Sequence, residues 1–163
     1  MKKEQGFSLI ELLIVVAIIA IIAAIAVPSM LQARMAANES GAIQGCRTVG
    51  SAEVAYSAIN NQNYGTLATL VTAGNLDGRF TSTGGFNGYT YADAAVNSAA
   101  VAPGGFGVQA TPATADSSGR YIYGINADQI VRYVGVAGSA PAPKCGTADC
   151  TANAPIGSTG SGS

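Results

Sequence analysis

The sequence contains no histidine and no tryptophan. Histidine is the commonest general base and the commonest metal ligand, so its absence removes the usual basis for catalysis and for transition-metal binding. Only 10% of the 163 residues are charged, with 8 Lys+Arg against 9 Asp+Glu, so no basic patch is available to bind nucleic acid by charge alone. No catalytic constellation is visible either. We therefore expect no enzymatic activity, no cofactor and no metal site.

The sequence has only three cysteines, which is an odd number: Cys46, Cys145 and Cys150. Cys145 and Cys150 would close a short loop if oxidised, which would stabilise the fold by roughly 2 kcal/mol. A C-x4-C pair without a nearby histidine is a weak zinc signal. Cys46 falls on an apolar helical stripe and is expected to be a buried thiol. The alternative is that it pairs with Cys145 or Cys150.

Acidic residues and aromatics are also thinly spread. The aspartates are expected to start turns or to be solvated rather than to bind calcium: Asp77, Asp93, Asp116, Asp128 and Asp149. The 7 Tyr and 4 Phe fall mostly at expected strand positions or on the helical stripe, so we interpret them as core residues rather than as a surface that stacks on single-stranded DNA or carries electrons.

What the chain does have is one long apolar run, from Phe7 to Val27. All of its residues are apolar except Ser8 and Glu11. As a helix it would span about 31 Å, which is enough to cross a bilayer. Inserting the charged Glu11 side chain into a bilayer costs free energy, on the order of 2.5–3.5 kcal/mol at the centre of a membrane helix and less near its end. This charge therefore needs a partner.

The residues that precede this run indicate a cleavage site before it. Residues 1–6 (M-K-K-E-Q-G) are short and basic, whereas a secretory signal is cut after its apolar region. Cutting after Gly6 would leave the run on the mature protein, with the new α-amino group of Phe7 four residues before Glu11. Within one subunit, Glu11 could fold back toward this amine, whereas in a bundle of parallel helices it could instead reach the amine of a neighbour displaced by about one turn. That pairing would set an axial register.

The start of the chain, K-K-x-x-G-F-S-L-I-E-L-L-I-V-V-A-I-I, resembles the type IV prepilins, the family of type IV pilins and type II secretion pseudopilins. The match runs from about Lys2 to Pro28. The resemblance implies that prepilin peptidase cuts between Gly6 and Phe7, that Phe7 becomes N-methylated, and that Glu11 is the assembly glutamate.

The resemblance further implies a ladle-shaped α+β fold, in which the apolar half of a long N-terminal helix protrudes from a four-stranded antiparallel sheet. It also implies a C-terminal disulfide, for which Cys145 and Cys150 are the candidates. Some family members carry a glycan near the C-terminus, where Ser163 or its neighbours could accept one. The Asn38-Glu39-Ser40 acceptor pattern is discounted because it lies in the middle of an expected helix.

Two other interpretations of the N-terminus compete. An uncleaved membrane anchor explains the apolar run but neither Gly6 nor Glu11. A secretory signal cut after Ala24-Ile25-Ala26 fits the small-x-small pattern, but a glutamate inside its apolar region argues against it.

Helical periodicity continues beyond Pro28, which should kink the helix because proline lacks a backbone donor. The expected buried stripe has spacings of threes and fours: Leu31, Met35, Ala42, Cys46, Val49, Tyr56 and Ile59. The polar residues between them are expected to face mostly outward: Gln32, Arg34, Asn38, Glu39, Arg47 and Glu53. Gly41, Gly45 and Gly50 should each weaken the helix by about 1 kcal/mol.

The rest of the chain is predicted to form turns, one short helix and strands. Residues 60–65 should end the long helix, 66–74 could form a short helix ended by Gly74, and 75–88 indicate a surface loop. Four runs are β-like: 89–96, 106–111, 120–126 and 129–135. Asn126-Ala127-Asp128 predicts a tight hairpin between the last two. An antiparallel meander packed on the helix would bury one face of each.

These features give the following expected organisation: leader 1–6, transmembrane and assembly helix 7–27, second half of the helix 28–60, globular region 61–150 and flexible tail 151–163. The first functional hypothesis is a type IV pilus subunit that is held in the inner membrane before assembly. Prepilin peptidase would cleave it, and the inner-membrane assembly machinery would then polymerise it into an extracellular fibre. The second is a periplasmic pseudopilin. The third is a membrane-tethered enzyme or binding module.

Overall fold

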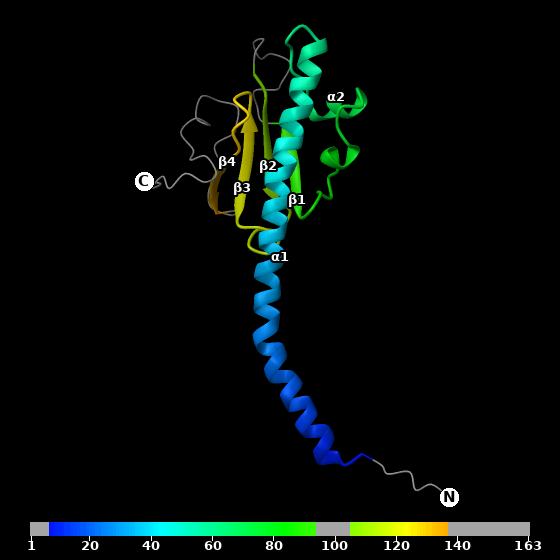
Figure 1. Cartoon of the computed structure of the whole chain (residues 1–163), viewed down its shortest axis with the longest axis vertical. Helices are drawn as coiled ribbons and strands as arrows, with labels where there is room; N and C mark the ends of the chain where they lie inside the picture. The colour runs from blue at the N-terminus through cyan, green and yellow to red at the C-terminus, as the bar shows by residue number, and fades with distance from the viewer. Residues whose placement is uncertain (1–6, 94–104, 137–163) are drawn as a thin grey trace, which may run out of the picture. The chain divides into compact units, whose positions relative to one another are not determined.

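The computed structural model describes residues 7–93 and 105–136. Its elements, in chain order, are α1 (Leu9–Ile59), α2 (Leu67–Thr72), the 3-10 helix η1 (Gly78–Thr81), and the strands β1 (Tyr89–Asp93), β2 (Gly107–Pro112), β3 (Tyr121–Asn126) and β4 (Arg132–Val136) (Figure 1). The chain divides into two compact units, residues 1–34 and 35–163, and α1 runs through the boundary between them.

The α1 helix is continuous over 51 residues and contains Pro28 in its interior. It ends where the sequence predicts, because Asn61 and Gln62 both adopt left-handed backbone angles, with φ of 53° and 62°. Asparagine accepts this conformation more readily than most residues. The predicted long N-terminal helix is therefore confirmed, including its continuation past the proline.

The predicted short helix is also confirmed as α2. Thr66 caps it by accepting a hydrogen bond from the backbone N–H of Thr69 at 3.1 Å. The chain leaves the helix through Gly74, whose φ of 77° suits a residue without a side chain. The expected loop from 75 to 88 contains one element that the sequence reading missed, η1, which Asp77 caps through the N–H of Arg79 at 2.8 Å.

The sheet is the antiparallel meander predicted from sequence, with strand order β1-β2-β3-β4. Tyr91 lies opposite Ala110, Ala110 opposite Tyr123, and Tyr123 opposite Tyr133, so one row of the sheet crosses all four strands. The predicted extension of the first strand to Val96 lies outside the described residues.

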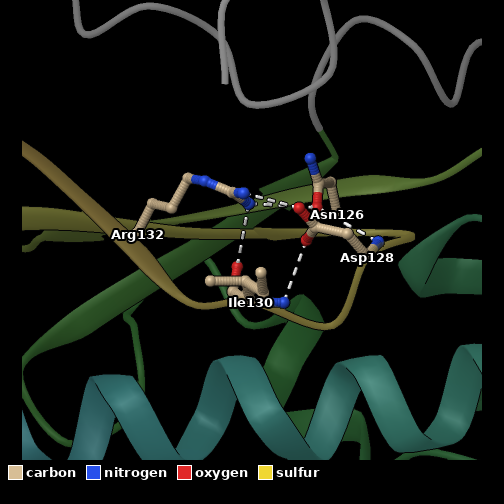
Figure 2. Close-up of polar contacts among 4 residues, drawn as sticks. All are labelled: Asn126, Asp128, Ile130 and Arg132. Carbon is tan, nitrogen blue, oxygen red and sulfur yellow. Dashed lines mark hydrogen bonds and ion pairs between the residues drawn. The ribbon is translucent and has the colours of Figure 1, made fainter. Parts of the chain in front are cut away.

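The hairpin between β3 and β4 forms, but its connection is longer than predicted and delays the start of β4 to Arg132. The N–H of Gln129 donates to the carbonyl of Asn126 at 3.0 Å, and the backbone of Gln129 adopts a left-handed conformation with a φ of 62°. The Arg132 guanidinium lies over this turn, with Nη2 2.6 Å from Asp128 Oδ2 and Nη1 3.4 Å from Asn126 Oδ1 (Figure 2). The buried arginine thus ties the turn to the strand that follows it.

The core of the 35–163 unit lies between the buried face of α1 and the sheet (Figure 1). It includes Ala42, Cys46, Val49 and Ala52 from α1, Leu67 and Leu70 from α2, and Tyr89, Tyr91, Val108, Ala110, Tyr123 and Ile125 from the strands. Of the predicted stripe, Tyr56 is half-buried, whereas Leu31 and Ile59 are 47% and 76% exposed. The prediction is wrong at both ends because the buried face of α1 runs only from Met35 to Glu53.

The prediction that polar residues of α1 face outward is correct for Gln32, Arg34 and Arg47, which are exposed. It is wrong for Glu53, which is fully buried. The reason is spacing: Glu53 lies four residues after Val49 and seven after Cys46, so the helix places it on the buried face. Asn38 and Glu39 are half-buried and bind backbone groups of Ser118 and Arg120 in the β2–β3 connection, at 2.8 and 2.9 Å.

Candidate functional site

The first half of α1 is apolar on all sides and has no protein cover. Every residue from Phe7 to Val27 is exposed, and no part of the most apolar 18-residue window is buried. Among the described residues, α1 is the one helix that is long and apolar enough to cross a membrane. Leaving a large aliphatic side chain in water instead of burying it costs about 1.5–3 kcal/mol. This segment therefore requires lipid or other protein segments around it.

Glu11 is the single ionisable residue of that segment and lies in the first turn of α1. A carboxylate is favoured there because the unpaired N–H groups of the first turn carry partial positive charge. Phe7, four residues earlier, precedes the helix and is 82% exposed. Both groups are thus placed at the tip of α1, while Gly6 lies outside the described residues.

One side of this segment also carries a shallow apolar groove that the sequence reading missed. Its lining repeats at helical spacing: Leu9, Leu12, Leu13, Val16, Ala17 and Ala20. Four of these residues are large and aliphatic, whereas Ala17 and Ala20 are small. Stripes of this kind accept a second helix, since small residues allow close approach. The spacing of alanines within the apolar run was the signal that could have predicted it.

The remaining predicted residues lie apart from this tip. Pro28 is inside α1, and the kink expected there stays a prediction. Cys145 and Cys150 lie outside the described residues. Cys46 is a free thiol, fully buried between α1 and the sheet, as the first interpretation of its position expected. Burial raises its pKa to about 12, because a thiolate would lose its hydration there.

Cys46 is therefore expected to resist alkylation in the folded protein. Treating the native chain with iodoacetamide at mildly alkaline pH should leave Cys46 unmodified, because almost none of the thiol is ionised below a pKa of about 12. After unfolding in denaturant, the same residue should react. Peptide mapping by mass spectrometry distinguishes Cys46 from the other cysteines. Complete native labelling of Cys46 would contradict the buried position.

The comparisons with known proteins agree with the geometry at the tip. An uncovered apolar helix with one carboxylate in its first turn, followed by an α+β unit, fits a subunit that is anchored in a membrane before assembly. Residues 1–27 match the family model described as the prokaryotic N-terminal methylation motif, which is the signature of type IV prepilins. The chain carries that signature over its first 27 residues. A search of curated proteins found no match.

Proposed function

We propose that the chain is the structural subunit of a type IV pilus, a surface fibre used for adhesion, twitching motility or DNA uptake. Prepilin peptidase removes residues 1–6 by cutting between Gly6 and Phe7, and Phe7 is N-methylated. The inner-membrane machinery then assembles the mature subunit into a helical filament. The observation that carries this proposal is the methylation motif on a helix whose apolar part holds one carboxylate and has no protein cover.

The energetics of such an assembly are favourable for this helix. In the membrane, lipid covers the apolar side chains from Phe7 to Val27. In a filament, the same side chains would be covered by the helices of neighbouring copies, so leaving the bilayer would not expose them to water. The groove lined by Leu9 to Ala20 offers one face on which a neighbouring helix can pack.

Glu11 would direct the register of that packing. Cleavage places a cationic amine on Phe7, at the exposed tip of the helix. A neighbouring subunit that is shifted by about one helical turn can bring this amine next to Glu11. Inside an apolar bundle, the pair neutralises two charges that would each be costly alone.

A second candidate is a subunit of a type II secretion pseudopilus, which would remain in the periplasm. The methylation motif favours it as much as a pilin, because both groups share this N-terminus. Purifying native surface filaments and sequencing their main subunit separates the two. Recovery of this chain from surface fibres supports the pilus, and its restriction to the periplasm supports the pseudopilus.

Intact-mass measurement of the native protein tests the processing. We expect a chain that begins at Phe7, carries one N-methyl group and contains a Cys145–Cys150 disulfide. A strain without prepilin peptidase is the matched control and should retain residues 1–6. A native chain that still begins at Met1, or one cut after Ala26, would overturn the proposal.

A further inference from the structure

A second hollow lies in the 35–163 unit, where α1 meets the segment that leads from α2 to β1. Its volume is about 370 Å³, which falls in the range of small-molecule pockets. Four of its lining residues recur at helical spacing on α1: Gly41, Gln44, Gly45 and Thr48. The others come from residues 75–80 and from the turn before β1. Distant parts of the chain therefore build this hollow together.

Apolar side chains form one part of the lining, namely Leu76, Phe80 and Phe86. Leu76 and Phe80 are buried, and Phe86 is half-buried. The rings of Phe80 and Phe86 lie 5.7 Å apart between centroids, at an angle of 60°. Phe80 also packs against Tyr91, with centroids 4.9 Å apart. Because these contacts hold the rings in place, the hollow offers a ligand a rigid apolar surface.

Arg79 and Asp77 are the two charged residues of the lining. Asp77 Oδ1 accepts the backbone N–H and the Nε–H of Arg79, at 2.8 and 3.0 Å, and the guanidinium carbon lies 4.5 Å from the centre of the Phe86 ring. The side-chain hydrogen bond from Arg79, together with the backbone one, holds the pKa of Asp77 below its usual value, so this acid is ionised at neutral pH. Within the described ranges, Arg79 Nη1 and Nη2 and Asp77 Oδ2 have no partner. The pair therefore offers fixed donors beside an acceptor, with no net charge.

Three side-chain amides complete the polar part of the lining: Gln44 on α1, Asn75 after α2 and Asn87 in the turn before β1. Among the residues that the structure describes, none of these amides has a hydrogen-bond partner. An amide side chain can both donate and accept hydrogen bonds. The hollow thus combines an apolar surface with several unused donors and acceptors, which is the usual composition of a small-molecule site.

We propose that this hollow binds a neutral sugar unit, a single pyranose ring with free hydroxyl groups. The C–H groups of such a ring can pack on Phe80 and Phe86, while each hydroxyl both donates and accepts, as the guanidinium, carboxylate and amides together require. An anion in the hollow would be repelled by Asp77, and a cation by Arg79. This assignment concerns the 35–163 unit and does not depend on whether the chain forms a pilus.

NMR titration of the ¹⁵N-labelled full chain tests the site. Dodecylphosphocholine micelles are suitable because this detergent contains no sugar. The probes are the methyl glycosides of glucose, galactose, mannose and N-acetylglucosamine, with inorganic phosphate as the anionic comparison. We expect at least one glycoside to shift the backbone amide signals of residues 41–48 and 75–87, with a dissociation constant of about 1–10 mM. Phosphate should leave these signals in place.

Arg79→Gln and Gln44→Ala remove polar groups from two different parts of the lining, and both should weaken glycoside binding about tenfold. Arg47→Gln is the matched control, because Arg47 is an exposed arginine of α1 outside the lining, and it should bind like the wild type. The amide spectrum shows in the same experiment that each variant is folded. The sugar site is refuted if no glycoside shifts these signals at about 100 mM, if phosphate shifts them instead, or if either lining variant binds as tightly as the wild type.

Discussion

Glu11→Ala is expected to abolish or strongly reduce filament assembly while leaving membrane insertion intact. Alanine removes the one charge from the segment Phe7–Val27, so the helix should enter a bilayer at least as readily as before. The amine of Phe7 in a neighbouring subunit would then lack its partner inside an apolar bundle. A loss of only 1.4 kcal/mol per contact weakens each subunit addition about tenfold.

The measurement is the yield of sheared filaments per amount of membrane-inserted subunit. Ser8→Ala serves as the control, because it removes a polar group just before the helix without changing the charge. Glu11→Gln preserves the shape of the side chain and should assemble as poorly as Glu11→Ala if charge is what matters. Wild-type filament yield from Glu11→Ala would remove the role assigned to this residue.

The N-terminal segment could be predicted from sequence because its defining properties are local. An apolar run of bilayer length, a single glutamate and a glycine before the run are all visible in consecutive residues. Alternation of side chains likewise predicted four strands, and a meander simply pairs strands that follow one another along the chain. These parts of the structure depend on neighbours along the chain.

The features that were missed depend on contacts between distant residues. Glu53 was assigned to the surface because it is charged, although its spacing from Val49 placed it on the buried face. The delayed start of β4 follows from Arg132 bonding across its own turn, which no propensity indicates. Gly45 and Gly50 were interpreted as weak points of the helix, but the residues that they contact, on β1, on β3 and in the β3–β4 turn, lie more than 40 residues away in the sequence.

Gly45→Ala is expected to destabilise the protein, although helix propensity alone predicts a gain of about 1 kcal/mol. Gly45 is buried on α1 against Tyr91 of β1, and a Cβ there would overlap the phenol group, lying 2.7 Å from its Cζ. The ring cannot move away freely, because Phe80 packs against it with centroids 4.9 Å apart. Overpacking of this kind costs about 1–3 kcal/mol.

Gly41→Ala is the matched control for Gly45→Ala on the same helix. A Cβ at Gly41 would meet only the side chain of Asn87, at 3.2 Å, and that exposed side chain can shift. Gly41→Ala should therefore be neutral or slightly stabilising, as propensity predicts. The difference in the free energy of unfolding between the two variants separates the effect of packing from that of helix propensity. Thermal or denaturant unfolding of the full chain in detergent measures this difference.

Tyr91→Phe then identifies the atom responsible for the cost of Gly45→Ala. The Tyr91 hydroxyl is buried and has no hydrogen-bond partner within the described residues, so removing it alone should cost little. In the double variant, the hydroxyl that overlaps the new Cβ is absent, and the loss caused by Gly45→Ala should shrink by more than about 0.5 kcal/mol. Additive losses, or a Gly45→Ala protein more stable than the wild type, would show that α1 and the sheet do not approach each other so closely.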